Sequence, residues 1–318
     1  MHAAVVHSFD SPPRYELVEV PSPSGPDEML AEVLAAGLHP RVRSGASGRH
    51  YSGSAALPFI PGVDGVGRLD DGRRVYFVTA DDRWGSMAEK AVVDLRRSVV
   101  LPEDVEPTLV AAAMNPAMSS WVALRHRSPL QEGQSVLVLG ATGNAGGMAV
   151  QVAKRLGAGR VVAAGRNTDR LEQLRDLGAD ALVALDGTEA GAARMAAVAA
   201  EVDIVLDYLW AAPARQALMA ILTARSDRSR ALDWVQIGAV AGPTMELPSV
   251  ALRSANLTIK GNGQGAVSTE AYVAALPSLI GEIGAGTLRV TPQAVSLAEV
   301  AAVWAAPEEP GVRVVLVP

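Results

Sequence analysis

The chain has 318 residues, enough for about two domains of ordinary size. It is 49% hydrophobic and 19% charged, a balance that favours a large buried core and excludes a disordered protein. Its formal net charge is −6 and it contains no cysteine, which argues against a nucleic-acid partner and excludes disulfides, thiolate nucleophiles and cysteine-ligated zinc.

The start of the chain lacks the basic residues and the long apolar run of an export signal, and prolines follow at positions 12 and 13. No window holds the roughly 18 uncharged apolar residues that a membrane helix needs. We therefore expect a cytoplasmic protein with no membrane partner.

The first hundred residues favour β-structure. Short apolar runs at 29–34, 74–78 and 88–93 are separated by clusters of Gly, Pro, Asp and Ser, which are typical of turns. Prolines are dense in this part of the chain, and proline suits turns and edge strands better than helix interiors.

From residue 108 the pattern changes to an alternation of apolar strands and helices joined by short loops, after a helix expected over 108–127. The predicted strands are 135–139, 160–164, 181–185, 203–206, 233–237 and 257–259, and the predicted helices are 144–156, 168–177, 188–201 and 211–222. This alternation predicts an α/β fold, a doubly wound parallel sheet with helices on both faces. The tail is expected to contain a helix over 269–282, irregular chain, a short helix over 297–304 and a strand over 312–317.

The strongest motif is a glycine loop that follows the first of these strands and opens a helix, which is the context that a dinucleotide fingerprint requires. Its glycines are Gly140, Gly143 and Gly146. A missing Cβ lets the backbone approach a pyrophosphate, and the free amides at the helix start bind the negative charge. The predicted cofactor contacts in this loop are Gly140, Thr142, Gly143, Asn144, Ala145 and Gly146.

The end of the next predicted strand indicates which dinucleotide binds. An NAD site usually has an acidic residue there to bind the ribose diol, but this chain has none until Asp169. Arg166, Asn167 and Arg170 occupy the region instead, and a guanidinium suits a 2′-phosphate. The cofactor is therefore predicted to be NADPH, with ordinary solvated arginines as the alternative interpretation.

Several short motifs in a fixed order resemble the medium-chain dehydrogenase/reductase superfamily, in its zinc-free quinone oxidoreductase-like branch. The matching segments are residues 35–40, 57–67, 85–89, 111–124, 236–238 and 259–261. The resemblance implies a GroES-like partial β-barrel made of residues 1–114 and 266–318, with a Rossmann NADPH-binding domain of residues 115–265 inserted between them. It also implies a homodimer.

This sequence departs from the superfamily at the positions that bind zinc in some of its members. The three positions that hold catalytic zinc in related alcohol dehydrogenases correspond here to His39, Val63 and Asn115. A catalytic zinc site needs three protein ligands, and only one of these residues can be a ligand. No metal site is therefore expected.

The resemblance also supplies catalytic candidates. It places His39 near the nicotinamide, where a neutral imidazole could donate a hydrogen bond to a substrate oxygen or to the ribose; alternatively His39 caps the turn before Pro40. Tyr51 is a candidate donor to the enolate or quinol oxygen, with loop packing as the alternative.

Further contacts are implied at matched positions. Ser119 is expected against the nicotinamide, and Arg313 resembles an arginine that reaches the pyrophosphate; without the resemblance Arg313 would be interpreted as a solvated strand residue. The strand ends at Gly238, Ala239, Asn262 and Gly263 are expected to bind the carboxamide. Trp84, Met118 and Trp121 either line an apolar substrate pocket or belong to the core.

Together these features predict an enzyme, an NADPH-dependent and zinc-independent oxidoreductase that transfers a hydride to a small quinone or α,β-unsaturated carbonyl substrate. Two alternatives stay open. One is a non-catalytic NADPH-binding or redox-sensing protein, and the other is a metal-free alcohol dehydrogenase or carbonyl reductase.

Overall fold

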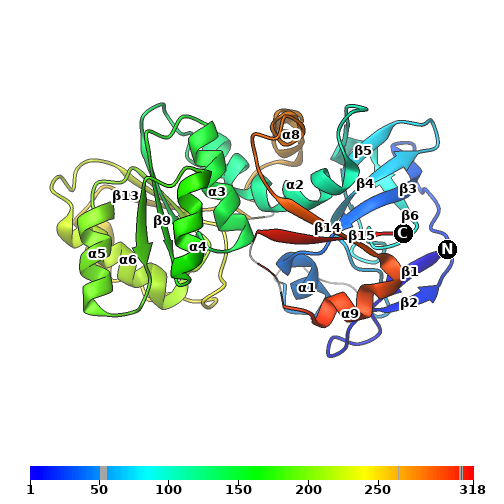
Figure 1. The fold of residues 1–318 in the computed structure, drawn as a ribbon, viewed down its shortest axis with the longest axis horizontal. Coiled ribbons are helices and arrows are strands. Elements are labelled where there is room, and N and C mark those ends of the chain that lie inside the picture. The colour runs from blue at the N-terminus through cyan, green and yellow to red at the C-terminus, as the bar shows by residue number, and fades with distance from the viewer. Residues whose placement is uncertain (51–55, 264, 308, 310) are drawn as a thin grey trace. The chain divides into compact units, whose positions relative to one another are not determined.

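The computed structural model describes residues 1–50, 56–263, 265–307, 309 and 311–318. The chain forms two compact units (Figure 1). Unit 1 comprises Met1–Asn115 and Ser268–Pro318, and unit 2 comprises Pro116–Val267. The first boundary lies within helix α2 (Pro107–Val122), next to Pro116, whose ring removes one helical hydrogen bond. Helix α2 is followed by a π-helical turn over Ala123–Arg127.

Unit 2 contains a parallel sheet with the strand order β10-β9-β8-β11-β12-β13. Its strands are β8 (Ser135–Leu139), β9 (Arg160–Gly165), β10 (Ala181–Ala184), β11 (Ile204–Asp207), β12 (Leu232–Gln236) and β13 (Leu257–Gly261). Its helices are α3 (Asn144–Arg155), α4 (Thr168–Gln173), α5 (Glu189–Ala199), α6 (Ala211–Ala224) and α7 (Ser249–Arg253), with a 3₁₀ turn over Leu174–Leu177. The predicted doubly wound α/β sheet is confirmed.

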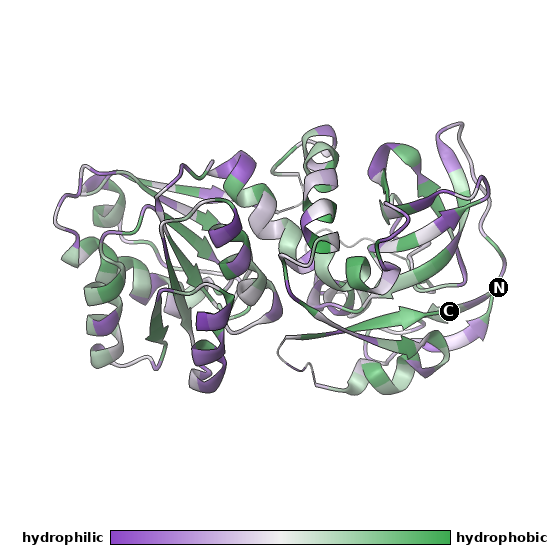
Figure 2. Ribbon diagram, turned by 45° about the horizontal axis from the view of Figure 1, so that its top comes forward, coloured by the Kyte–Doolittle hydropathy of each residue, from purple (hydrophilic) through white to green (hydrophobic). Residues whose placement is uncertain are grey.

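The core of unit 2 follows from these apolar strands, which Figure 2 shows in green. The side chains of Leu137, Leu139 and Trp234 pack with those of α5 and α6 in one buried cluster. Helices α3 and α4 lie on the opposite side of the sheet (Figure 1). Burial of both faces explains why the strands are continuous apolar runs rather than alternating ones.

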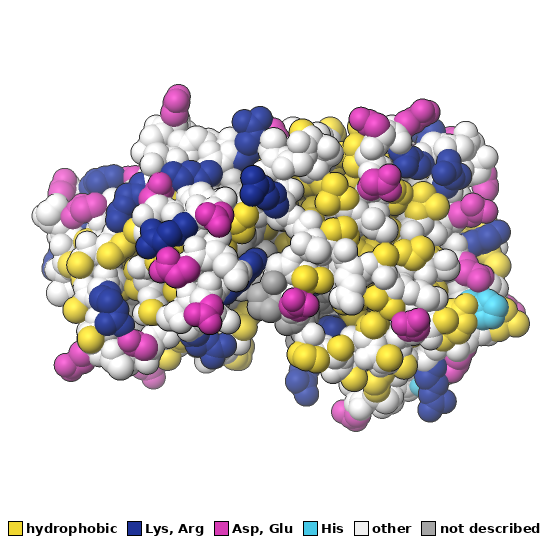
Figure 3. Space-filling model, viewed as in Figure 1, with side chains coloured by type: hydrophobic (Ala, Val, Ile, Leu, Met, Phe, Trp, Pro, Cys, Tyr) yellow, Lys and Arg dark blue, Asp and Glu magenta, His cyan; other side chains and the backbone are white. Residues whose placement is uncertain are grey.

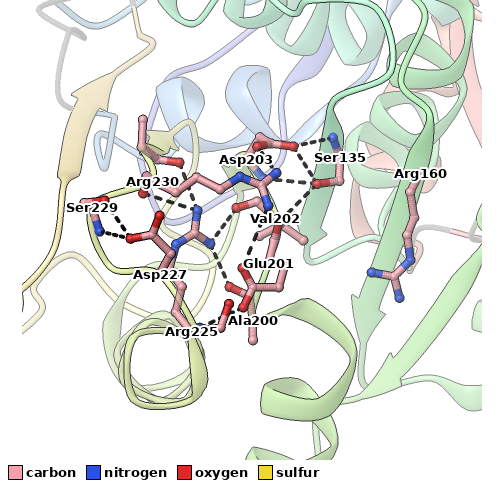
Figure 4. A network of polar contacts seen from close by, with 12 residues as sticks. Ser135, Arg160, Ala200, Glu201, Val202, Asp203, Arg225, Asp227, Ser229 and Arg230 are labelled. Atoms are coloured by element: carbon pink, nitrogen blue, oxygen red, sulfur yellow. Dashed lines mark hydrogen bonds and ion pairs between the residues drawn. The ribbon is translucent and has the colours of Figure 1, made fainter.

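A polar network fixes the amino ends of the central strands (Figure 4). Arg225, at the end of α6, donates from Nη1 to the carbonyl oxygens of Ala200 (2.7 Å) and Val202 (2.9 Å) and from Nη2 to that of Ala231 (3.0 Å). Asp203 accepts from the backbone and hydroxyl of Ser135 at 2.8 and 2.7 Å. The opposite, carboxyl edge of the sheet is therefore left for the loops that can bind a ligand.

Unit 1 contains a mainly antiparallel sheet with the order β14-β15-β3-β4-β5-β7, in which β6 also pairs with β3. Its strands are β3 (Glu28–Gly37), β4 (Asp64–Leu69), β5 (Arg74–Val78), β6 (Lys90–Asp94), β7 (Ser98–Val100), β14 (Thr291–Ser296) and β15 (Val312–Val317). A separate hairpin joins β1 (His2–Val5) to β2 (Arg14–Leu17). The helices are α1 (Pro40–Ala46), α8 (Thr269–Gly284) and α9 (Val300–Ala305), with 3₁₀ turns over Leu95–Arg97 and Leu297–Glu299.

The carboxyl-terminal tail belongs to unit 1. Strand β15 pairs antiparallel with β3, with Val315 opposite Gly37 and Leu316 opposite Ala36, and Leu316 lies in the same buried cluster as Val33. Unit 2 is therefore inserted between two segments of unit 1.

One element predicted for the tail is wrong. Residues 291–296, which were expected to be irregular, form β14 and pair in parallel with β15. The segment contains Pro292 and buries little apolar surface, so its sequence carries a weak strand signal; an edge position tolerates both features. No helix in the described ranges is long and apolar enough to cross a membrane.

Candidate functional site

The glycine loop of unit 2 connects β8 to α3. Gly140 has a φ of +89°, a conformation that favours glycine, and the amides of Gly140 and Ala141 both donate to the carbonyl oxygen of Ala164 in β9 at 2.9 Å. Gly143 is the N-cap residue of α3 and has no side chain to cap the first helical amides. A helix start of this kind can bind a phosphate through its backbone.

The three glycines have different physical roles. A Cβ on Gly146 would lie 2.2 Å from the carbonyl oxygen of Gly140, so glycine is needed there for α3 to pack closely on the loop. A Cβ on Gly140 would meet Leu209 at 3.0 Å. Gly143 is exposed, and a Cβ there would have only the Gly140 oxygen within 4 Å, at 3.6 Å. The open side of the loop therefore lies at Gly143, and these residues fit a pyrophosphate.

The neighbouring loop residues are half-buried. Thr142 packs over the end of β9, where a Cβ on Gly165 would lie 2.5 Å from its methyl group. Asn144 and Ala145 form the first residues of α3 and are half-buried as well. The loop that follows β8 is thus held against the end of β9.

The predicted arginines lie at the end of β9. Arg166 is exposed, whereas Arg170 is half-buried, donates from Nη1 to Gln173 (2.7 Å) and brings Nη2 within 3.8 Å of a Cβ built on Gly147 in α3. Asn167 uses its side-chain oxygen to cap α4 by accepting from the Arg170 amide at 2.9 Å. Basic side chains interspersed with acidic ones cover the face that carries α3 and α4 (Figure 3). The Arg166 guanidinium is therefore the more accessible of the two.

On the other side of the glycine loop, the ends of α2, β11 and β13 are brought together. The hydroxyl groups of Ser119 and Tyr208 are 3.0 Å apart, and Asn262 donates from Nδ2 to the Ser119 carbonyl oxygen at 2.8 Å. Gly238 donates its amide to the Asp207 carbonyl oxygen at 3.1 Å. Ala239 and Gly263 are exposed beside them in sequence. Sequence reasoning missed Tyr208, because a single tyrosine after a strand carries no signal.

In unit 1, His39 lies in a buried polar group of three residues. Its side chain is 1% exposed, its Nε2 lies 3.1 Å from Asp64 Oδ1, and the Tyr76 hydroxyl donates to Asp64 Oδ2 at 2.7 Å. Burial lowers the pKa of His39 against the opposing effect of Asp64, so the ring is held neutral. Among the residues that the structure describes, the buried His39 Nδ1 has no hydrogen-bond partner.

This geometry changes the role expected for His39. If the neutral ring donates from Nε2 to Asp64, its remaining nitrogen carries a lone pair, so Nδ1 accepts a hydrogen bond and does not donate one. The alternative interpretation, a cap before Pro40, applies to the backbone: His39 is the N-cap residue of α1, its carbonyl oxygen accepts from the Arg43 amide at 3.2 Å, and its side chain makes no capping hydrogen bond.

The other predicted residues have varied environments. Arg313 is 3% exposed and donates from Nη1 to the Leu38 carbonyl oxygen at 3.0 Å, so it is not a solvated strand residue. Met118 and Trp121 are buried in α2, at 5% and 2% exposure, and Trp84 is half-buried with the Arg83 guanidinium 5.2 Å from its ring centre. Tyr51 lies outside the described residues.

The three positions that correspond to zinc ligands contain His39, Val63 and Asn115. Within the described part of the chain, no group of three or more His, Cys, Asp or Glu side chains could hold a metal ion.

Comparisons with known proteins agree with this architecture. The family model described as "Zinc-binding dehydrogenase" matches residues 145–277. A probable NADPH-dependent quinone reductase of Emericella nidulans is 31% identical, over 100% of both chains. An NADPH-dependent alkenal/one oxidoreductase of Arabidopsis thaliana is 29% identical over 51% of this chain and 46% of its own length. The quinone oxidoreductase of Thermus thermophilus, solved also with NADPH, superposes with a TM-score of 0.81 at 28% identity over 100% of both chains.

Proposed function

The chain belongs to the medium-chain dehydrogenase/reductase superfamily, in its quinone oxidoreductase-like branch, and on that premise we propose that it is an NADPH-dependent reductase of quinones or α,β-unsaturated carbonyl compounds. The observation that carries the proposal is the start of α3 at the exposed Gly143, an N-cap residue without a side chain, in the same unit as the exposed Arg166 at the end of β9. Relatives whose names include NADPH dependence and quinone or alkenal reduction support it.

The cofactor roles follow from the loop geometry. The backbone amides of Thr142, Asn144, Ala145 and Gly146 are proposed to bind the pyrophosphate, because the N-cap residue Gly143 has no side chain with which to cap the start of α3. Arg166 is proposed to bind the 2′-phosphate, with Arg170 and Asn167 shaping that end of the site. Arg313 stays a proposed pyrophosphate contact, and its burial means that it would act from a fixed position.

NADPH, when bound, supplies a hydride to an electron-poor carbon of the substrate. Ser119 and the backbone of Gly238, Ala239, Asn262 and Gly263 are proposed to orient the nicotinamide end. His39 is proposed to accept a hydrogen bond at Nδ1 from a ribose or substrate hydroxyl, with Asp64 fixing its ring through Nε2. The proton that completes the reduction then has to come from water or from Tyr51, the proposed donor.

The proposal also covers zinc, the oligomeric state, the substrate pocket and the location in the cell. Hydride transfer needs no metal ligand in this scheme, so the enzyme is proposed to be independent of zinc. A homodimer is proposed because β13 is an edge strand of the parallel sheet, and apolar side chains of Val250 and Leu252 on α7 are half-exposed. Trp84, Met118 and Trp121 are proposed to contribute to an apolar substrate pocket, and a cytoplasmic location is part of the same proposal.

The decisive experiment measures cofactor oxidation at 340 nm with a panel of small quinones and enones, using NADPH and NADH in parallel. We expect turnover with NADPH and a lower kcat/KM with NADH. Arg166→Ala should raise the KM for NADPH by about tenfold to a hundredfold, the worth of one charged hydrogen bond, and leave NADH kinetics unchanged. The matched control is Arg175→Ala, since Arg175 pairs with Glu172 on the surface at 2.9 Å.

The outcomes separate the candidates. Tight NADPH binding without turnover across the panel favours a redox-sensing protein, and an alcohol product from a saturated carbonyl favours a carbonyl reductase. Equal use of NADH and NADPH, or an Arg166→Ala variant with unchanged NADPH kinetics, refutes the assignment of the 2′-phosphate site.

A further inference from the structure

The turn that follows β11 has an unusual backbone. Trp210 has a φ of 57° with a ψ of −163°, and Ala211 has a φ of 53°. The first of these combinations is adopted almost only by glycine, so a residue with a Cβ is strained there. A tryptophan and an alanine therefore occupy a turn that glycine would form without strain.

A buried carboxylate holds this turn. Asp207, which ends β11 and is 0% exposed, accepts at Oδ1 from the amides of Leu209 (2.8 Å) and Trp210 (3.0 Å). Its Oδ2 accepts from the indole Nε1 of Trp234 in β12 at 3.0 Å. Burial raises the pKa of Asp207, and these three donors oppose that effect. The turn is therefore fixed from within the core.

The turn lies between the two loops that form the proposed cofactor site. A Cβ on Gly140 would lie 3.0 Å from Leu209, and a Cβ on Gly238 would lie 2.8 Å from the Tyr208 carbonyl oxygen. Strand β9, which follows β8 in the chain, lies on one side of β8 in the sheet, and β11 lies on the other side. Such a switch point is where open α/β sheets bind ligands.

Tyr208 projects from this turn. Its side chain is 8% exposed, and its hydroxyl lies 3.0 Å from that of Ser119 at the end of α2. Ser119 is also held from β13, because its carbonyl oxygen accepts from Asn262. Burial raises the pKa of Tyr208 to about 12, so the phenol keeps its proton at neutral pH.

We propose that Tyr208 is a positioning residue for the nicotinamide half of the cofactor, which fixes the Ser119 hydroxyl through a hydrogen bond and is itself held by the strained turn on Asp207. The inference rests on the proposed function. The strand order supports it: Arg166 follows β9 on one side of the glycine loop, and Tyr208 follows β11 on the other. The 2′-phosphate and the nicotinamide of one dinucleotide would then lie on opposite sides of that loop.

The test separates the two halves of the cofactor. Binding of 2′,5′-ADP, which contains only the adenine half, is measured by calorimetry beside steady-state NADPH kinetics in Tyr208→Phe. We expect the Kd for 2′,5′-ADP to stay within about twofold of wild type, and kcat/KM for NADPH to fall about threefold to tenfold, the worth of one neutral hydrogen bond. Arg166→Ala serves as the reciprocal control, because it should weaken both ligands.

A double-mutant cycle tests the pairing with Ser119. Tyr208→Phe and Ser119→Ala should be non-additive, so that the double variant loses little more NADPH kcat/KM than either single variant. If Tyr208→Phe does not fold, Ser119→Ala alone must show the same split between the two ligands. This inference is overturned, and the proposed function still stands, if Tyr208→Phe leaves NADPH kinetics unchanged, if it weakens NADPH and 2′,5′-ADP equally, or if the two substitutions are fully additive. A wild-type protein that binds neither NADPH nor 2′,5′-ADP refutes the proposed function, and this inference with it.

Discussion

Two glycines of the same loop should respond in opposite ways to an added methyl group. In Gly146→Ala, the new Cβ would lie 2.2 Å from the Gly140 oxygen and 2.6 Å from the Ala141 Cα, and both are backbone atoms that cannot rotate away. Either α3 or the loop has to shift, and such overpacking costs roughly 1–3 kcal/mol. In a unit of this size that loss lowers Tm by about 3–10 °C.

In Gly143→Ala, the new methyl group meets nothing closer than 3.6 Å, and the φ of −80° and ψ of 165° suit alanine. The entropic gain of about 0.4–1 kcal/mol from a less flexible unfolded chain offsets the small loss in N-cap preference, so Tm should stay near the wild-type value. The methyl group would stand where a phosphate has to approach the amides of α3. Losing one charged hydrogen bond there weakens NADPH about tenfold to a hundredfold.

The assay pairs thermal unfolding without ligand and fluorescence titration with NADPH for both variants. We expect Gly146→Ala to lose stability and Gly143→Ala to lose affinity while keeping its Tm. If Gly143→Ala binds NADPH as tightly as wild type, the open side of the loop is not the phosphate site. If Gly146→Ala is as stable as wild type, the inference that α3 packs too closely on the loop to admit a Cβ is wrong.

Three further predictions concern the buried polar groups and the strained turn. Burial lowers the pKa of His39, so as the pH falls from 7.5 to 5.5 the imidazole is protonated in the unfolded chain before it is protonated in the folded one, and the free energy of unfolding should decrease by up to about 1.4 kcal/mol per pH unit. In urea unfolding, the free energy of unfolding of His39→Asn should depend less on pH, and an unchanged pH dependence would show that His39 is not its source. Trp210→Gly should relieve the backbone strain and raise Tm while slowing NADPH turnover, and a lower Tm would mean that the indole packing outweighs the strain. Arg225→Leu should lose about 3–5 kcal/mol in denaturant unfolding because it leaves buried carbonyl oxygens without their donor, whereas the exposed Arg215→Leu should stay within about 0.5 kcal/mol; equal effects would show that the network has no special weight.

Local patterns made the nucleotide-binding unit predictable. Strand β8 spans Ser135–Leu139 and includes the whole apolar run of residues 136–139, and α3 begins at Asn144, directly after Gly143. Both signals act over a few residues, since a buried parallel strand is apolar throughout and a phosphate loop requires glycine. The strand over 291–296 was missed because its pairing partner, β15, supplies the reason for its conformation.

By itself, the sequence determined the order of strands and helices, the glycine loop and the arginines that follow β9. Only the tertiary structure decided that residues 291–296 form a strand beside β15, that His39 Nε2 faces Asp64, and that the Tyr208 hydroxyl meets that of Ser119. Each of these depends on a partner far away in the chain: Asp64 lies 25 residues from His39, and Tyr208 lies 89 residues from Ser119. A hydrogen bond fixes which atom of a side chain is used, and that choice exists only once folding has brought the two partners together.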